Sequence, residues 1–253
     1  MLKVDYNLSF SEPGVVYWKC SLKSISGDHT GPDFKRRIIL DDLPKVSFAP
    51  LFGVPVYELK IEGFESRQKA LIEEILSMKT RDAGVAVSNK GGWHSKQNLH
   101  QSENADIRWL FGEILKVSNS CIRHSKTAPE GARIALTTSW ANINESGDWN
   151  APHAHFPADW SGVFYVRSNQ KQAETIKSEN DGDILFFDPL PLGPQYRRPP
   201  TMFKKPSNGK MFLFPSYLVH MVAPHFEQEP RISVSFNFRV TLPRQNSGES
   251  QDI

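Results

Sequence analysis

The spacing of hydrophobic residues divides the chain into a helical part and a later part with a shorter period. Leu71, Ile75 and Met78 recur at helical spacing within residues 65–79, and a second apolar stripe runs through residues 102–124. This spacing gathers apolar side chains on one face of a helix. The sequence therefore predicts two amphipathic helices in its first half.

After residue 130 the apolar positions fall into short β-branched and aromatic runs, each bounded by Gly, Pro, Asp or Asn. Such runs are typical of strands. Helices that precede a series of strands favour an α+β fold with an antiparallel core. The strands that we predict, with one earlier strand before the helices, are 56–61, 133–147, 161–168, 182–189, 209–216, 220–225 and 231–240.

Composition narrows the classes of protein that need to be considered. The chain has 253 residues, a net charge of +2, and two isolated cysteines. The near-neutral charge gives no reason to expect nucleic acid or a membrane as partner, and no apolar run approaches the ~20 residues of a membrane helix. Lone cysteines make no disulfide framework. We expect a cytoplasmic protein with an N-terminal arm of unclear structure (1–45), one main domain (46–242) and a disordered tail (243–253).

Two histidines stand one residue apart in the stretch NAPHAHFPADWSG, just before a predicted strand. If His153 and His155 lie at a strand end, both imidazoles point to the same side. Imidazole is a ligand for iron, zinc, copper and nickel alike. Such a pair on its own is more often structural or exposed than a metal site, so the hypothesis needs further ligands.

His220 is the best candidate for a third ligand. It follows FLFPSYLV, a buried apolar strand that ends in a turn, and a rigid element of this kind holds a ligand well. His225 lies after an Ala-Pro pair, and we expect it at the surface. The histidines that we expect not to bind metal are His29, His94, His100 and His124.

Arg231 opens the last predicted strand, where its side chain shares a face with Ser233 and Ser235. A polar face inside a strand-rich core is costly unless it meets a partner. The arginine fork with a hydroxyl beside it is suited to hold a carboxylate through two hydrogen bonds. A plain solvated sheet face is the alternative interpretation of this strand.

Several separated segments together resemble one enzyme family. They are SWANINESGDWNAPHAHFPADWSGVFYV, GDILFFDP and GKMFLFPSYLVHMVAPHFEQEPRISVSFNF. The block is similar to the 2-oxoglutarate- and Fe(II)-dependent oxygenases, most of all to their bacterial and phage group, over roughly residues 48–240. The resemblance implies a double-stranded β-helix (a jelly roll, cupin-like) with the two helices packed outside it.

The same resemblance implies roles for particular residues. His153 takes the place of the first iron ligand and His220 that of the last. Arg231, with Ser233 beside it, takes the place that pairs with the far carboxylate of 2-oxoglutarate. Two further cosubstrate candidates are Tyr165, which matches a tyrosine that bonds the same carboxylate, and, more weakly, Asn142.

The sequence departs from the family pattern at His155, where most members have Asp or Glu. We favour His155 as the third ligand of a three-histidine site. Two alternatives stay open: His155 does not bind and water fills its place, or Asp159 supplies the carboxylate. Pro157 speaks against Asp159, because proline interrupts the strand that would carry both side chains.

The implied activity is hydroxylation of a small molecule or side chain with release of succinate and CO2. Two other functions remain open. One is a three-histidine cupin-type enzyme, a thiol dioxygenase or a zinc enzyme, that does not use 2-oxoglutarate. The other is a jelly-roll module that binds a ligand without catalysis. A homodimer is possible.

The Pro-rich loop 189–209 carries Arg197, Arg198, Lys204 and Lys205, and we expect it to be a lid. Its basic residues are compatible with an acidic or phosphorylated substrate. A solvated lid without such a role is the interpretation that we favour.

Overall fold

The computed structural model describes residues 3–12, 15–23, 53–168, 180–190 and 200–242 of the chain. The chain forms two compact units, Met1–Gly53 and Val54–Ile253. Among the helices of the described residues, none is long and apolar enough to cross a membrane.

The first unit contains a two-stranded antiparallel sheet. Strand β1 (Lys3–Glu12) pairs with β2 (Val15–Lys23), and the register shifts between Phe10 and Glu12. The expected arm 1–45 covers this hairpin. Its boundary with the main domain stays a prediction, and the expected tail 243–253 lies outside the described residues.

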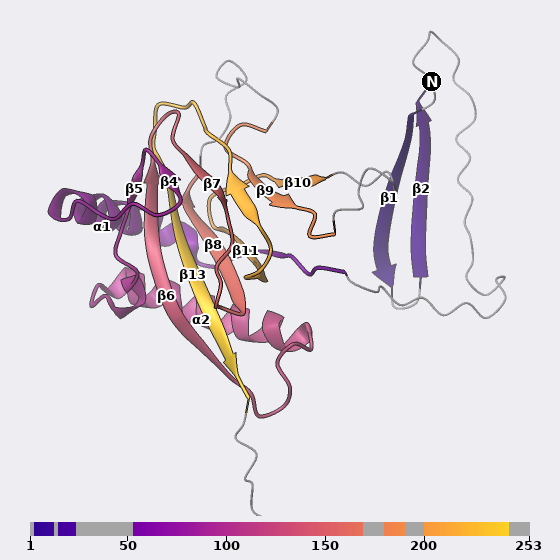
Figure 1. Ribbon diagram of the computed structural model, residues 1–253, viewed down its shortest axis with the longest axis horizontal. Coiled ribbons are helices and arrows are strands. Elements are labelled where there is room, and N and C mark those ends of the chain that lie inside the picture. Colours follow the sequence, from indigo (N-terminus) through magenta and orange to yellow (C-terminus); the bar gives the residue numbers. More distant parts are fainter. Residues whose placement is uncertain (1–2, 13–14, 24–52, 169–179, 191–199, 243–253) are drawn as a thin grey trace, which may run out of the picture. The chain divides into compact units, whose positions relative to one another are not determined.

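The second unit is built on two antiparallel sheets (Figure 1). The larger sheet has six strands, in the order β3 (Tyr57–Lys60), β11 (Lys210–Pro215), β8 (Trp160–Arg167), β13 (Arg231–Thr241), β6 (Arg133–Asn144) and β5 (Trp93–His94). The smaller sheet has five, in the order β10 (Thr201–Lys204), β9 (Ile184–Phe187), β12 (His220–Val222), β7 (Trp149–His153) and β4 (Asn89–Lys90).

Two helices pack on the outer face of the six-stranded sheet, α1 (Gln68–Arg81) and α2 (Ala105–His124), each preceded by a short 3₁₀ turn (Phe64–Ser66 and Leu99–Gln101). In Figure 1, α2 lies across the strands of this sheet. The Asn104 side chain accepts hydrogen bonds from two backbone N–H groups of the first turn of α2, which fixes where the helix begins. Both helices and the α+β class agree with the prediction.

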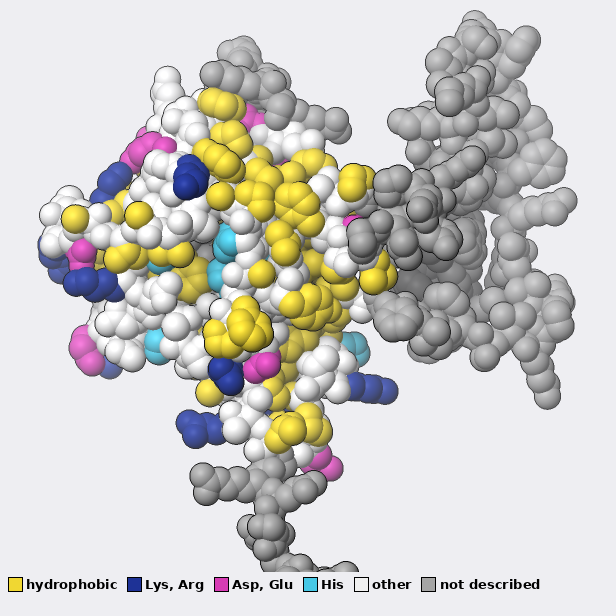
Figure 2. Space-filling model, viewed as in Figure 1, with side chains coloured by type: hydrophobic (Ala, Val, Ile, Leu, Met, Phe, Trp, Pro, Cys, Tyr) yellow, Lys and Arg dark blue, Asp and Glu magenta, His cyan; other side chains and the backbone are white. Residues whose placement is uncertain are grey.

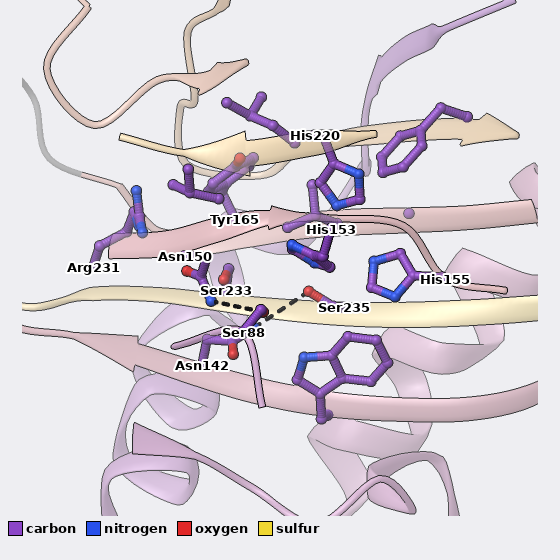
Figure 3. A pocket seen from close by; sticks show the side chains of 16 residues that line it. Ser88, Asn142, Asn150, His153, His155, Tyr165, His220, Arg231, Ser233 and Ser235 are labelled. Carbon is purple, nitrogen blue, oxygen red and sulfur yellow. Dashed lines mark hydrogen bonds between the residues drawn. The ribbon is translucent and has the colours of Figure 1, made fainter. Parts of the chain in front are cut away.

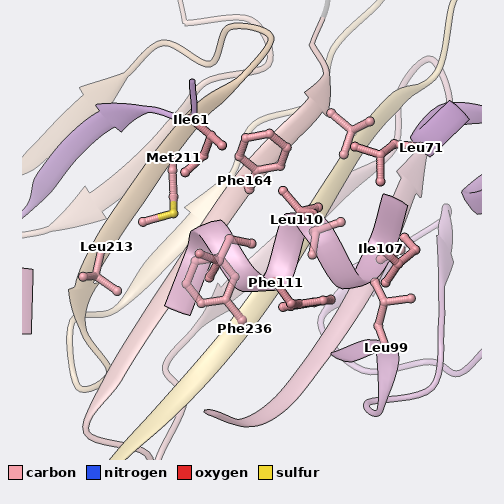
Figure 4. Packing of buried hydrophobic residues seen from close by; sticks show 14 of the residues in the cluster. Ile61, Leu71, Leu99, Ile107, Leu110, Phe111, Phe164, Met211, Leu213 and Phe236 are labelled. Atoms are coloured by element: carbon pink, nitrogen blue, oxygen red, sulfur yellow. The ribbon is translucent and has the colours of Figure 1, made fainter. Parts of the chain in front are cut away.

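The central strands of the larger sheet alternate between two environments. On β13, Ile232, Val234 and Phe236 are fully buried against the helices, together with Phe164 of β8 and Leu110 of α2 (Figure 4). The residues between them face the other sheet, because successive side chains of a strand point to opposite faces. Arg231 and Ser233 therefore lie inside the protein, between the two sheets, and the solvated-face interpretation of this part of the strand is wrong.

A small residue in β8 allows the core of the larger sheet to close. Gly162 lies opposite Phe236 in the β8–β13 pairing. A Cβ atom at this position would overlap the Phe236 ring and lie 2.8 Å from the Phe212 carbonyl oxygen. Glycine is thus required here by the close approach of an aromatic ring from the next strand.

A second apolar cluster lies between the sheets. It includes Tyr165 of β8, Phe186 of β9 and Phe212 and Phe214 of β11. The Phe186 and Phe214 rings meet edge to face, with their centroids 4.9 Å apart. This cluster closes one side of the space that holds the candidate site.

The loop predicted for 189–209 is only partly a loop. Its end contains β10, which pairs with β9, while residues 191–199, with Arg197 and Arg198, lie outside the described residues. Lys204 Nζ is 3.1 Å from Glu58 Oε2. Lys204 is therefore occupied by an ion pair in this structure.

Candidate active site

Three histidines predicted as metal ligands meet where two inner strands of the smaller sheet, β7 and β12, end and begin. His153 is the last residue of β7, His155 follows two residues later, and His220 opens β12. Strands β7 and β12 pair so that His220 lies directly opposite His153. One ring nitrogen from each histidine lies within 4.8 Å of the others, and the ring centroids are 4.4 to 5.1 Å apart. The structure thus brings together all three predicted ligands.

Two of these histidines are held in a defined tautomer by the backbone. His153 Nδ1 is 2.7 Å from the Ala151 carbonyl oxygen, and His220 Nδ1 is 3.0 Å from that of Leu218. A carbonyl oxygen only accepts, so each Nδ1 carries the proton and donates it. The Nε2 atoms of both rings therefore keep a free lone pair, which is how a metal-binding histidine is usually oriented.

The His155 ring is held differently. Among the described residues it has no hydrogen-bond partner; instead it packs beside Trp140, with ring centroids 5.5 Å apart. Its backbone N–H donates to the Ser216 carbonyl oxygen over 3.0 Å, which fixes the chain but not the ring. Of the three imidazoles, His155 is therefore the one whose orientation a bound metal has to fix.

The electrostatics of the cluster favour neutral rings. Burial, together with repulsion between the neighbouring imidazoles, lowers the pKa of His155 to about 2 and that of His220 to about 3. The pKa of His153 is also lowered, mainly by burial. Neutral imidazoles offer lone pairs without competition from protons. Three converging nitrogen donors of this kind fit a divalent transition metal.

Asp159, the alternative carboxylate ligand, points elsewhere. Its Oδ2 accepts a hydrogen bond of 2.7 Å from the Val240 backbone N–H, and Arg239 Nε lies 3.9 Å away. In the part of the chain that the structure describes, no carboxylate joins the histidine cluster. The hypothesis that Asp159 completes the metal site is therefore not supported by its position.

A narrow inner cavity of about 40 Å³ leads from the histidines into the space between the sheets. Figure 3 shows the imidazoles at one end and Arg231 at the other, with Tyr165 and Ser233 between them. Asn142 of β6 also lines it. The four predicted cosubstrate residues thus come from three adjacent strands and face one cavity.

Several polar atoms along the inner cavity are buried without a hydrogen-bond partner in the structure. They are the Tyr165 hydroxyl, Arg231 Nε and Asn142 Oδ1. Burial raises the pKa of the Tyr165 hydroxyl, so it remains a donor at neutral pH. Buried polar groups normally find partners. A guanidinium nitrogen and a phenol hydroxyl that are left without partners fit the carboxylate of a ligand.

The surroundings of Arg231 only partly satisfy its charge. One guanidinium nitrogen, NH1, donates to the Gly182 carbonyl oxygen over 3.2 Å. Burial lowers the pKa of Arg231, while the charges of Tyr165, Asp148 and Asp181 act in the opposite direction. The guanidinium is therefore held in place by the fold before any ligand arrives.

A larger outer cavity of about 610 Å³ lies on the other side of the histidines. Both cavities are lined by Ser88, Trp140, His153 and His155, so the histidine cluster lies between them. On the face shown in Figure 2, histidine atoms reach the surface among hydrophobic ones. The inner cavity has room for only a few water molecules, and a five-carbon dicarboxylate requires its lining side chains to move apart.

The remaining histidines test the sequence-based assignments. His225 is 2% exposed, and its Nε2 is 2.8 Å from the Asn144 carbonyl oxygen, so the expectation of a surface histidine was wrong. The surrounding chain encloses it although an Ala-Pro pair precedes it. His94, His100 and His124 are not part of the three-histidine cluster, and His29 lies outside the described residues.

Some residues that line the two cavities were not identified from the sequence. Asn150 lines the inner cavity, and His94 and Lys90 line the outer one. His94 and Lys90 lie in strands of two residues each, which are too short to produce an alternating pattern. Of these residues, only the histidine in GGWHSK could have been singled out from the sequence. The Gly-rich, polar residues around it predicted a loop and gave no reason to place it at a cavity.

The sequence was compared with models of known protein families and with curated proteins. Residues 138–237 match the family described as "Putative 2OG-Fe(II) oxygenase". None of the curated proteins matches the chain. The matched segment runs from β6 to β13 and contains His153, His155, His220 and Arg231.

Solved structures establish the fold. A prolyl-4-hydroxylase from Pseudomonas putida has a TM-score of 0.52 and 14% identity, covering 73% of this chain and 91% of its own. A prolyl hydroxylase from Trichoplax adhaerens, in complex with a peptide fragment of hypoxia inducible factor, has a TM-score of 0.54 and 12% identity, covering 73% and 83%.

The non-heme alpha ketoglutarate dependent epimerase SnoN from nogalamycin biosynthesis has a TM-score of 0.55 and 13% identity, covering 78% of this chain and 87% of its own. The predicted fold, an α+β double-stranded β-helix with flanking helices, is confirmed by these likenesses. Residues 138–237 of the chain are therefore similar to the 2OG-Fe(II) oxygenases, and this likeness supports Fe(II) and 2-oxoglutarate as cofactors.

Proposed function

We propose that this protein hydroxylates a small molecule, with His153, His155 and His220 as the iron ligands. One observation carries the proposal: three neutral imidazoles converge at the mouth of a cavity whose far end holds a buried, partly unsatisfied arginine. Together Fe(II) and 2-oxoglutarate supply the oxidation of a C–H bond by O2, coupled to conversion of the cosubstrate to succinate and CO2.

The chain contributes a prearranged set of metal donors. His153 and His220 present Nε2 lone pairs that the Ala151 and Leu218 carbonyl oxygens have already fixed. His155 adds a third neutral donor in the place where most of the family has a carboxylate. Because all three ligands are neutral, the metal keeps its full positive charge, which favours binding of an anionic cosubstrate.

The inner cavity contributes the recognition of the cosubstrate. The Arg231 guanidinium and the Tyr165 hydroxyl donate to the far carboxylate, with Ser233 beside them and Asn142 as a further contact. A charge-assisted pair in such a buried place is stronger than one in water. The aromatic cluster around Phe214 packs at the opposite, histidine end of this cavity, where the Phe214 and His220 ring centroids are 4.8 Å apart.

The family's substrates include small molecules and peptides, and we propose the former for this chain. We also propose a cytoplasmic location, where reducing conditions suit both Fe(II) and the free thiol of Cys121.

The direct test is the formation of succinate. The purified protein is supplied with Fe(II) and 2-oxoglutarate in air, and succinate is measured with and without a panel of candidate substrates. Cobalt(II) binding is titrated in parallel, because its absorption reports the metal site without turnover. His153→Ala and His220→Ala are expected to lose both signals. The matched control is His124→Ala, which removes an exposed histidine at the end of α2.

A three-histidine enzyme that does not use 2-oxoglutarate predicts a different outcome. It predicts tight metal binding that depends on the same histidines, but no affinity for 2-oxoglutarate and no succinate. A non-catalytic module predicts that neither histidine variant changes metal content. Either outcome contradicts the proposed function.

A further inference from the structure

The outer cavity, at about 610 Å³, has the size of a pocket for a small organic ligand. Trp140, 6% exposed, forms part of its wall beside His153 and His155. Phe156, 89% exposed, and Val87, 57% exposed, lie at its edge. The walls therefore offer aromatic and apolar surface directly next to the metal cluster.

Several polar residues of this cavity already have partners within the protein. Thr137 Oγ1 donates to the Asn237 carbonyl oxygen, and Asn237 Nδ2 donates to Thr138 Oγ1. The Asn237 side-chain oxygen accepts from Ser161 Oγ over 2.7 Å. These hydrogen bonds stabilise the wall of the cavity. A ligand would therefore be recognised by the other polar groups that line it.

One of the remaining groups is His94. Its Nδ1 is 2.6 Å from the Ser95 carbonyl oxygen, so Nδ1 carries the proton and Nε2 is an acceptor. The ring stacks on Trp140, with centroids 5.3 Å apart and planes 10° from parallel. His94 is 2% exposed and lines the cavity. The fold thus presents one fixed hydrogen-bond acceptor beside a flat aromatic wall.

Two further polar groups that line the cavity are cationic. Lys90 of β4 is exposed and, among the described residues, has no ion-pair partner. Arg239 of β13 is 53% exposed, and its Nε is 3.9 Å from Asp159 Oδ2, a loose contact. None of the described residues that line the cavity is Asp or Glu. A cavity lined by two cationic side chains and by no described carboxylate favours binding of an anion.

We propose that the outer cavity takes the substrate and selects a small organic anion, a carboxylate or a phosphate. The anion meets Lys90 and Arg239, a flat apolar body lies against Trp140, and a hydrogen-bond donor on that body meets His94 Nε2. This inference rests on the proposed function in placing the substrate beside the metal cluster. The binding preference itself depends only on the cavity.

The first test compares three molecules that share one flat body with an N–H donor. Indole-3-acetate is an anion, indole-3-acetamide is neutral, and tryptamine is a cation. Affinities are measured by ligand-observed NMR on protein loaded with zinc(II) and 2-oxoglutarate, which does not turn over. We expect the acid to bind about tenfold more tightly than the amide, and tryptamine to bind most weakly.

The double variant Lys90→Gln/Arg239→Gln is expected to bind the acid and the amide equally well. Its matched control is Lys69→Gln/Arg108→Gln, which removes one lysine and one arginine from α1 and α2, outside both cavities. The control is expected to keep the preference for the acid. The same comparison is made for a phosphate, with 4-hydroxyphenyl phosphate as the anion and hydroquinone as the neutral molecule. The anion type, carboxylate or phosphate, that shows the larger preference over its neutral counterpart is the one that the cavity selects.

The role of His94 is tested with naphthalene-1-acetate, which has the anion and a flat body but no donor. The wild-type protein is expected to prefer indole-3-acetate over it by about threefold to tenfold. His94→Phe keeps a ring against Trp140 and removes the acceptor, so the preference is expected to disappear.

Failure of this inference is distinguishable from failure of the proposed function. Affinity for 2-oxoglutarate, measured in the same samples, reports on the inner cavity, and the indole series is repeated without 2-oxoglutarate. The inference is overturned if the three indoles bind within a factor of about two of one another, if tryptamine binds best, or if the double variant keeps the preference for the acid.

Discussion

The two faces of the six-stranded sheet follow one rule of strand geometry but serve different ends. The outer face carries Ile232, Val234 and Phe236 of β13, which are fully buried against the helices. The inner face carries Arg231 and Ser233 from the same strand, with buried polar atoms left unsatisfied. The outer face supplies stability, and the inner face gives up some of it to hold a ligand.

The largest expected effect is on the outer face. Phe236→Ala removes a fully buried ring and should lower the free energy of unfolding by about 3–5 kcal/mol. Its neighbour on the inner face, Ser235, makes one 3.3 Å hydrogen bond from Asn142, and Ser235→Ala should cost only about 1 kcal/mol. Urea unfolding of both variants measures the contrast. Equal losses would mean that the two faces do not differ in this way.

The next largest effect is on the inner face, where a substitution should weaken ligand binding and not lower stability. Arg231→Met removes a buried guanidinium and should raise the Kd for 2-oxoglutarate by roughly 100-fold. Its stability should stay the same or rise, because the charge is only partly compensated in the free protein. Calorimetric titration of the zinc-loaded protein gives the affinity. A large loss of stability without change in affinity would assign Arg231 to the core instead.

A smaller and more diagnostic effect is expected at Tyr165. Its hydroxyl is buried without a partner, so Tyr165→Phe should stabilise the ligand-free protein by about 1 kcal/mol. The same change should weaken 2-oxoglutarate binding by about tenfold, because the hydroxyl no longer donates to the ligand. Opposite signs in the unfolding and binding measurements are the signature of a group kept for a ligand. Destabilisation in both would show a structural role.

The smallest effect concerns the helices that cover the outer face. Asn104→Ala removes the side chain that caps α2 and should lower the free energy of unfolding by about 1 kcal/mol. The affinity for 2-oxoglutarate should stay as in the wild type, because the cap lies on the far side of the sheet from the inner cavity. A change in that affinity would indicate that the helices influence the site.

The parts of the protein that the sequence predicted well are those governed by local periodicity. The period of the apolar residues located both helices, and the alternation along β13 placed Arg231, Ser233 and Ser235 on one face of the strand. The rings of His153 and His155 converge as expected, although β7 ends at His153 and the strand spacing behind that expectation does not reach His155. These features depend only on geometry that repeats within a few residues.

The parts that were missed depend on contacts between distant segments. His225 is buried because the Asn144 carbonyl oxygen meets it from 81 positions earlier in the chain, and an Ala-Pro pair does not show this. Lys90 and Arg239 come to one cavity from strands of different sheets. Strand β10 forms inside an expected loop because β9 offers it an edge.

The most direct test of the central claim is a crystal structure of the protein with Fe(II) and 2-oxoglutarate, prepared without oxygen. We expect iron bound by His153, His155 and His220, and the far carboxylate of 2-oxoglutarate in contact with Arg231 and the Tyr165 hydroxyl. Iron coordinated at another place, or a cosubstrate whose far carboxylate lies away from Arg231, would contradict the account.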